Sequence, residues 1–147
     1  MKLNFLSGNH PLEGHVNLDG QRLPGTTKVA WIDPWYPKLP FRADTFEEIY
    51  ANNAVEHIAN PNALIQEFWR ISKNGARWYI LTPGYRDPNS WNDPTHLSHW
   101  ADKMLDFYTE WGFDGRRYGP ALISYRFEGD NDHGLTFHVI ARKTGIP

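Results

Sequence analysis

Short apolar runs alternate with turn residues along the whole chain, and most of these runs have the length of a strand. Strand candidates lie at 2–6, 15–18, 28–32, 48–51, 77–81, 123–128 and 135–141. The last two flank a Gly129-Asp130-Asn131-Asp132 turn, which predicts an antiparallel hairpin near the C-terminus.

Two other segments carry apolar residues at helical spacing. The first has Asn60 as a good N-cap and Pro61 at the first helical position, and Asn74-Gly75 predicts its end. The second runs from about 98 to 111 and places several aromatic residues on one face.

The order of these elements predicts an α/β fold, because strands that alternate with helices build parallel sheets. Only about eight residues separate the first strand candidate from the second, and a parallel crossover normally needs a dozen or more. The helices of the first half are therefore expected to be reduced. No linker or repeat divides the chain, so residues 1–147 are read as a single domain.

Composition excludes several classes of function. The formal net charge of −2 leaves no basic surplus for gripping nucleic acid, so general nucleic-acid binding is not expected. The absence of cysteine removes thiolate chemistry and fits a reducing compartment. The N-terminus lacks the apolar run of a signal peptide, and no run has the length of a membrane span. We therefore expect a cytoplasmic protein without membrane attachment.

Small or polar side chains stand at the ends of four successive strand candidates. In a doubly wound sheet these ends converge on one crevice, where ligands bind. Each position has an ordinary explanation as a turn or a polar loop, and it is their combination that indicates a site. The residues are Ser7, Gly8, Asn9, Asp19, Asp33 and Asn52.

Three stretches carry a resemblance to a known family. They read Leu3-Asn4-Phe5-Leu6-Ser7-Gly8-Asn9 with Asn17-Leu18-Asp19, then Leu39-Pro40-Phe41 with Ala54-Val55-Glu56-His57-Ile58, then Leu64 to Gly75. Together they resemble compact class I S-adenosylmethionine-dependent methyltransferases. The resemblance covers nearly the whole chain in the right order, and Leu39 to Gly75 is its most specific part.

The resemblance implies a Rossmann-like, mixed seven-stranded sheet, mostly parallel, with S-adenosylmethionine lying over the strand ends. Ser7, Gly8 and Asn9 would then face its methionine part. Asp19 would hold the ribose hydroxyls, Asp33 would face the adenine edge, and Asn52 would form the floor beside the cofactor. The family usually has glycine where Leu6 stands, which puts the shape of the turn in question.

The segment 89–100 is the densest in histidine and aromatic residues. Asp93, His96 and His99 could bind zinc, but their spacing matches no strong metal signature and no distant third ligand is identifiable, so no metal site is predicted. In the methyltransferase interpretation His96 is the candidate general base. For His99 a structural role is favoured, as it is for His57.

We expect an enzyme that methylates an unidentified acceptor, with a small molecule favoured. The alternative is a degenerate binding module that uses the fold without transfer. A nucleotide-sugar binder is disfavoured because the chain lacks a phosphate loop. The reduced first half leaves room for a homo-oligomer or another partner to complete the pocket. Aromatic residues that could frame a substrate are Trp35, Tyr36, Tyr85 and Trp91.

Overall fold

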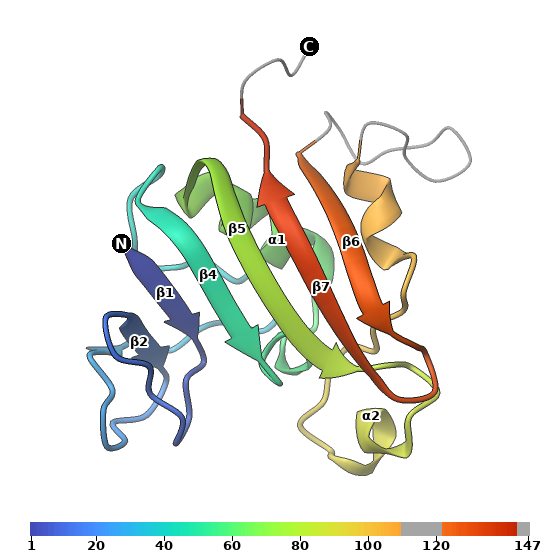
Figure 1. The fold of residues 1–147 in the computed structure, drawn as a ribbon. Coiled ribbons are helices and arrows are strands. Elements are labelled where there is room, and N and C mark those ends of the chain that lie inside the picture. Colours follow the sequence, from blue (N-terminus) through green and yellow to red (C-terminus); the bar gives the residue numbers. More distant parts are fainter. Residues whose placement is uncertain (110–121, 144–147) are drawn as a thin grey trace.

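One seven-stranded sheet organises the computed structural model, which describes residues 1–109 and 122–143 (Figure 1). Its strands are β1 (Lys2–Phe5), β2 (Val16–Asp19), β3 (Lys28–Val29), β4 (Phe46–Asn52), β5 (Ser72–Pro83), β6 (Ile123–Gly129) and β7 (Gly134–Ala141). The order across the sheet is β3-β2-β1-β4-β5-β7-β6. All of these strands run in the same direction except β7, which is antiparallel to both β5 and β6. The predicted mixed sheet with its C-terminal hairpin is confirmed.

The helices are short. They are α1 (Pro61–Ile71), α2 (Pro88–Asn92) and two 3-10 turns, η1 (Val55–His57) and η2 (Met104–Tyr108). Within the described residues no helix has the length and apolar character needed to cross a membrane.

The core lies between α1 and one face of the sheet. Phe68 of α1 meets Phe5 of β1 and Trp78 of β5 edge-to-face, with ring centroids 5.1 and 5.6 Å apart. All three side chains are fully buried. On the opposite face, turned toward the viewer in Figure 1, the described helices leave the sheet uncovered.

The connection between β1 and β2 contains no helix, as the sequence predicts, and two buried asparagines replace one. Asn4 Nδ2 donates to Asn17 Oδ1 and to the carbonyl oxygen of His10. Asn17 in turn accepts from the Leu12 N–H and donates to the Leu12 carbonyl. These bonds hold the segment 8–15 to the strands, so ten residues suffice for a parallel connection that normally needs more.

Several predicted boundaries are wrong, among them the ends of β3 and α1. The third strand ends at Val29 rather than residue 32, and α1 ends at Ile71 rather than at Asn74-Gly75. Ser72 ends the helix because its backbone is extended, while its hydroxyl donates to the Phe68 carbonyl and accepts from Trp78 Nε1.

The predicted helix at 98–111 is also wrong over 98–103, where the chain is a loop. Tertiary bonds explain this, since the N–H groups of Leu97 and Ser98 both donate to the carbonyl oxygen of Glu56. A 3-10 turn follows at Met104–Tyr108, and residues 110 and 111 lie outside the described residues. The helix α2 was not predicted, although Asp87 caps it and Pro88 starts it.

Candidate functional site

The turn after β1 contains two residues with a left-handed backbone. Leu6 and Gly8 both have positive φ, 48° and 51°, a region that favours glycine. The Leu6 side chain is partly buried and packs against the core. A Cβ built on Gly8 would meet no atom within 4 Å, so the space beside this glycine is open.

Asp19 lies directly beside this turn. Its Oδ2 accepts from the Gly8 N–H at 2.9 Å, and its Oδ1 accepts from the Gln21 N–H at 3.0 Å. Each carboxylate oxygen keeps one further acceptor position, so the side chain is able to bind a diol as well. The structure thus brings together Ser7, Gly8 and Asp19, three of the residues predicted to hold a cofactor.

Asp33 follows β3 and starts a turn, because its Oδ1 accepts from the N–H groups of Trp35 and Tyr36. Its Oδ2 makes no hydrogen bond to any other described residue, and it is free to accept one. Trp31, Trp35 and Tyr36, which are close to Asp33 in the sequence, have exposed aromatic rings. Asn52 ends β4, and its side-chain oxygen accepts from Asn53 Nδ2.

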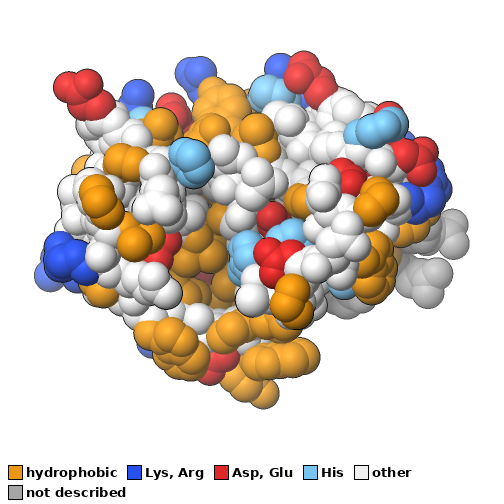
Figure 2. Space-filling model, turned by 90° about the horizontal axis from the view of Figure 1, so that it is seen from below, with side chains coloured by type: hydrophobic (Ala, Val, Ile, Leu, Met, Phe, Trp, Pro, Cys, Tyr) orange, Lys and Arg blue, Asp and Glu red, His pale blue; other side chains and the backbone are white. Residues whose placement is uncertain are grey.

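A cavity of about 870 Å³ opens at the carboxyl ends of β4 and β5 and the start of β7. Asn52 lines it, so this residue lies between the cavity and the strand ends that carry Gly8 and Asp19. Figure 2 looks onto this edge of the sheet and shows a hollow with histidine and acidic side chains gathered beside it. The cavity wall holds Glu56, His57, Asp93 and His96.

His96 is fixed in this wall by its own loop. Its Nδ1 lies 3.2 Å from the Ser90 carbonyl oxygen, and its Nε2 lies 3.4 Å from Asp93 Oδ2. The loop is held against η1 by the bonds from Leu97 and Ser98 to Glu56, and Trp100 anchors it as a fully buried side chain. His96 therefore lines the cavity, although no helix begins at Ser98.

The loop ordering also sets the charge of Asp93. Hydrogen bonds from the Thr95 hydroxyl and N–H lower the pKa of Asp93, with His96 adding a smaller electrostatic contribution. Asp93 is therefore ionised at neutral pH. His99 is placed differently, because its ring stacks on Trp91 at 3.4 Å and its Nδ1 bonds to the Ser90 hydroxyl.

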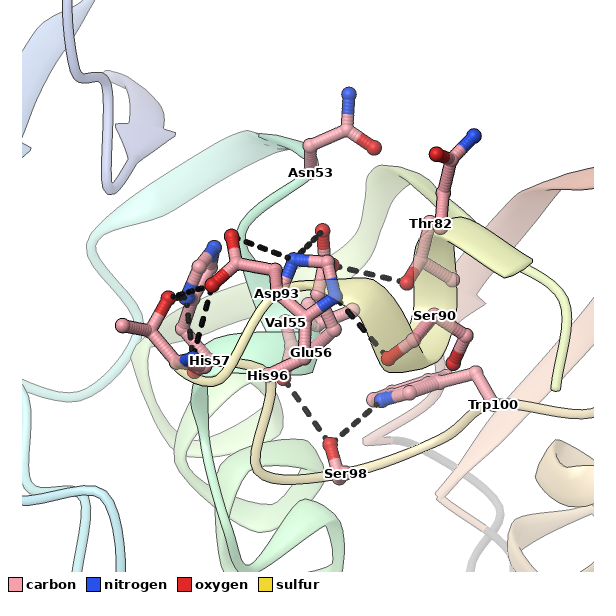
Figure 3. Close-up of polar contacts among 12 residues, drawn as sticks. Asn53, Val55, Glu56, His57, Thr82, Ser90, Asp93, His96, Ser98 and Trp100 are labelled. Atoms are coloured by element: carbon pink, nitrogen blue, oxygen red, sulfur yellow. Dashed lines mark hydrogen bonds and ion pairs between the residues drawn. The ribbon is translucent and has the colours of Figure 1, made fainter. Parts of the chain in front are cut away.

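Sequence reasoning missed Glu56. Its side chain is 1% exposed, Oε2 accepts from the Thr82 hydroxyl, and Oε1 finds no hydrogen-bond donor among the described residues. Figure 3 shows Glu56, His57 and His96 converging from two segments of the chain. A signal was present, since Glu56 lies in the short run Ala54-Val55-Glu56-His57-Ile58 with three apolar residues, and glutamate is an unusual residue to bury.

A sequence model of the methyltransferase domain family matches residues 15–80. The resemblance to class I methyltransferases is confirmed. Solved structures with this fold include a S-adenosylmethionine-dependent methyltransferase from Aquifex aeolicus, with 15% identity, a TM-score of 0.58, and coverage of 95% of this chain and 81% of that one. No match was found among curated proteins.

Two further structures share the methyltransferase fold. The YcgJ protein of Bacillus subtilis has 12% identity and a TM-score of 0.59, with 97% of this chain and 92% of that chain covered. A chain of the Haloferax volcanii complex between the Trm112 methyltransferase activator and a protein described as a methyltransferase has 14% identity and a TM-score of 0.62, with 97% and 82% covered. At such identities the likeness establishes the fold.

Proposed function

We propose that this chain is a S-adenosylmethionine-dependent methyltransferase acting on a small molecule. The observation that carries the proposal is spatial. Polar groups at the carboxyl ends of β1 and β2 adjoin a cavity at the ends of β4 and β5, with Asn52 between them. In open α/β sheets, ligands bind at these strand ends. The cavity of about 870 Å³ is of the size that small molecules occupy.

The cofactor would lie over Ser7, Gly8 and Asn9. The open space beside Gly8 supports this placement, as does the buried Ser7 hydroxyl, which has no hydrogen-bond partner among the described residues. Asp19 would accept from both ribose hydroxyls, and Asp33 Oδ2 would accept from the adenine amino group. Exposed aromatic rings beside Asp33 offer a surface on which adenine can stack.

The acceptor would enter the cavity beside Asn52 and His96. Its nucleophilic atom forms a bond to the methyl carbon while the carbon–sulfur bond breaks and the electron pair stays on sulfur. The protein's main contribution is alignment of the two reactants and removal of water. His96 assists on the acceptor side, and its predicted role as general base stays a prediction.

A binding module without transfer is the second candidate, and Leu6 favours it. A leucine at positive φ costs about 1–2 kcal/mol, which the family's usual glycine avoids.

The Haloferax methyltransferase-fold protein is seen with an activator. A partner chain is therefore proposed here too, because the first half of the sheet lacks the usual helices. The cytoplasmic location expected from the lack of cysteine is kept in the proposal.

Thermal unfolding with added ligand tests the cofactor proposal. S-adenosylhomocysteine and S-adenosylmethionine should each raise the unfolding midpoint, because a ligand that binds only the native state stabilises it by about 2.7 kcal/mol at one hundred times its Kd. ATP and NAD at equal concentration serve as controls. A midpoint that moves equally with ATP, or with none of the four, would contradict the proposal.

Transfer separates an enzyme from a binding module. S-adenosylmethionine carrying a labelled methyl group is incubated with the chain and a panel of small hydroxyl, amine and carboxylate compounds. Labelled product that requires the folded chain supports the enzyme. Cofactor binding without product from any compound supports the binding module.

A further inference from the structure

We propose that Glu56, His57 and His96 bind a divalent transition-metal ion in the wall of the cavity. One ligand atom from each residue lies within 4.8 Å of the other two. Glu56 and His57 come from η1, and His96 comes from the loop after α2, so the fold and not local sequence brings them together (Figure 3). Two imidazoles with one carboxylate is a donor set found in catalytic zinc sites.

The tautomer of His57 follows from its hydrogen bonds. Its Nδ1 faces the Thr95 carbonyl oxygen at 3.1 Å and the Thr95 hydroxyl at 3.2 Å. The carbonyl oxygen can only accept, and the hydroxyl proton is already donated to Asp93 at 2.6 Å. Nδ1 must therefore carry the proton, which leaves a lone pair on Nε2 when the ring is neutral.

The same reasoning applies to His96. Its Nδ1 faces the Ser90 carbonyl oxygen at 3.2 Å and is the donor, so Nε2 is the free nitrogen. Histidines that ligate metals through Nε2 commonly donate their Nδ1 hydrogen to a backbone carbonyl, which fixes the ring. Both histidines of this cluster have that support.

Glu56 supplies the second observation. Glu56 is only 1% exposed, and its Oε1 has no hydrogen-bond donor among the described residues. An unpaired oxygen of a buried carboxylate is costly unless a cation compensates it. Oε1 lies 3.9 Å from His96 Nε2, too far for a hydrogen bond. A cation between these atoms would satisfy both.

The distances fit a metal after a small closure. Ligands bonded to zinc at about 2.0–2.1 Å with tetrahedral angles lie about 3.4 Å apart, so ligand atoms up to 4.8 Å apart must draw together by up to about 1.4 Å. Asp93 Oδ2 already lies 3.4 Å from His96 Nε2 and is available as a fourth ligand. A set of two imidazole nitrogens and one carboxylate oxygen suits zinc, cobalt, nickel or iron among the first-row ions.

A metal at this position would refine the acceptor chemistry, and this step rests on the proposed function. The ion would hold an acceptor hydroxyl and favour loss of its proton to bulk water. The oxygen then attacks the methyl carbon, and the products are a methyl ether and S-adenosylhomocysteine. With Nε2 bound to the ion, His96 positions the acceptor and does not take the proton.

Titration of the chelator-treated full chain with zinc chloride tests the site by calorimetry, without S-adenosylmethionine. We expect one tight site per chain, and cobalt chloride should give the visible absorption of a low-coordinate cobalt–imidazole centre. His57→Ala and Glu56→Gln should each weaken zinc binding about tenfold or more, since even indirect supports of a metal are worth about 10–100-fold. His99→Ala is the matched control and should bind zinc as the unmodified chain does.

The proposal is overturned if the unmodified chain binds no zinc, or if His57→Ala leaves zinc affinity unchanged. It is also overturned if His99→Ala loses as much affinity as His57→Ala, because surface histidines then account for the binding. Circular dichroism checks each variant, and the half-buried His57 keeps the test usable if Glu56→Gln does not fold. Binding of S-adenosylhomocysteine without zinc would leave the proposed function intact, whereas zinc binding without S-adenosylhomocysteine would leave only the metal site.

Discussion

Leu6 shows how a single residue shapes the proposed cofactor site. Its φ of 48° gives the turn after β1 a left-handed backbone, and its partly buried side chain packs against the core. The apolar contact offsets part of the backbone cost, because burying a leucine contributes about 1.5–3 kcal/mol. A leucine can therefore occupy a position where the resemblance implies glycine.

Gly8 offers a test at the same scale, through Gly8→Ala. The alanine methyl would enter the open space where the cofactor is proposed to lie, so affinity for S-adenosylhomocysteine should fall about tenfold or more. The positive φ alone should cost about 1 kcal/mol of unfolding free energy. Calorimetric titration and thermal unfolding measure the two effects separately.

Gly14→Ala is the matched control. Gly14 also has a positive φ, 75°, with no atom within 4 Å of a built Cβ, but it precedes the amino end of β2, whereas Gly8 follows the carboxyl end of β1. It should lose similar stability and keep full affinity for S-adenosylhomocysteine. Equal affinity in both variants would mean that the turn at Gly8 is only a turn.

The sequence predicts which candidate residues lie near one another only where strand order decides it. Asp19 and Gly8 end adjacent strands, so parallel topology alone brings them together. The cluster of Glu56, His57 and His96 depends on how the loop after α2 folds back over η1. That fold is decided by backbone hydrogen bonds and by the burial of Trp100, which no spacing rule describes.

At the scale of elements, α1 fixes the segment that precedes β4. Glu67 Oε2 accepts from the Leu39 N–H, and Arg70 donates to the carbonyl oxygens of Leu39 and Phe41. Glu67 and Arg70 also pair with each other at 2.6 Å. Desolvation alone would raise the pKa of Glu67, but the hydrogen bonds from Arg70 and Leu39 outweigh it and lower the pKa.

Glu67→Gln should therefore destabilise the chain in a pH-dependent way. A lowered pKa in the folded state means that the carboxylate contributes stability above its unfolded pKa of about 4.3, and that this contribution is lost as the pH falls through the folded value. We expect a loss of about 1 kcal/mol at pH 7, reduced by partial solvent screening, and a smaller difference from the unmodified chain below pH 4. Urea unfolding at each pH measures it.

The exposed Glu13 provides the comparison for this experiment. Glu13→Gln should change the unfolding free energy little at any pH, because the Glu13 side chain is exposed and contributes little to the folded state. A Glu67→Gln variant whose loss of stability is independent of pH would assign the effect to packing and not to charge.

Element boundaries were predictable where capping chemistry is local and not where distant groups intervene. Asn60 begins α1 as expected, since its side chain accepts from the Ala63 N–H. The end of α1 depends on Trp78, a residue of β5 that bonds to Ser72. In the same way, the loop at 98–103 is held by Glu56, more than forty positions away along the chain.

At the scale of the whole molecule, the sheet is covered on one face and solvated on the other. The open face carries polar or charged positions in register across neighbouring strands, such as Lys2 beside Glu48 and Glu48 beside Arg77. Parallel sheets that are covered on both faces have strands that are apolar throughout. In this sheet, β5 and β7 alternate buried and more exposed residues. The alternation in the sequence is therefore consistent with the reduced helices.

This solvated face has a consequence for the heat capacity of the protein. Unfolding normally raises the heat capacity by about 12–15 cal/mol/K per residue, because newly exposed apolar surface raises it and newly exposed polar surface lowers it. Here the polar face is hydrated before unfolding, and the chain has less apolar surface left to expose than a sheet covered on both sides. Differential scanning calorimetry should give a value below that range, and a value at or above it would mean that the face is covered in solution. A small heat-capacity change flattens the stability curve, so the free energy of unfolding should vary little between cold and physiological temperatures.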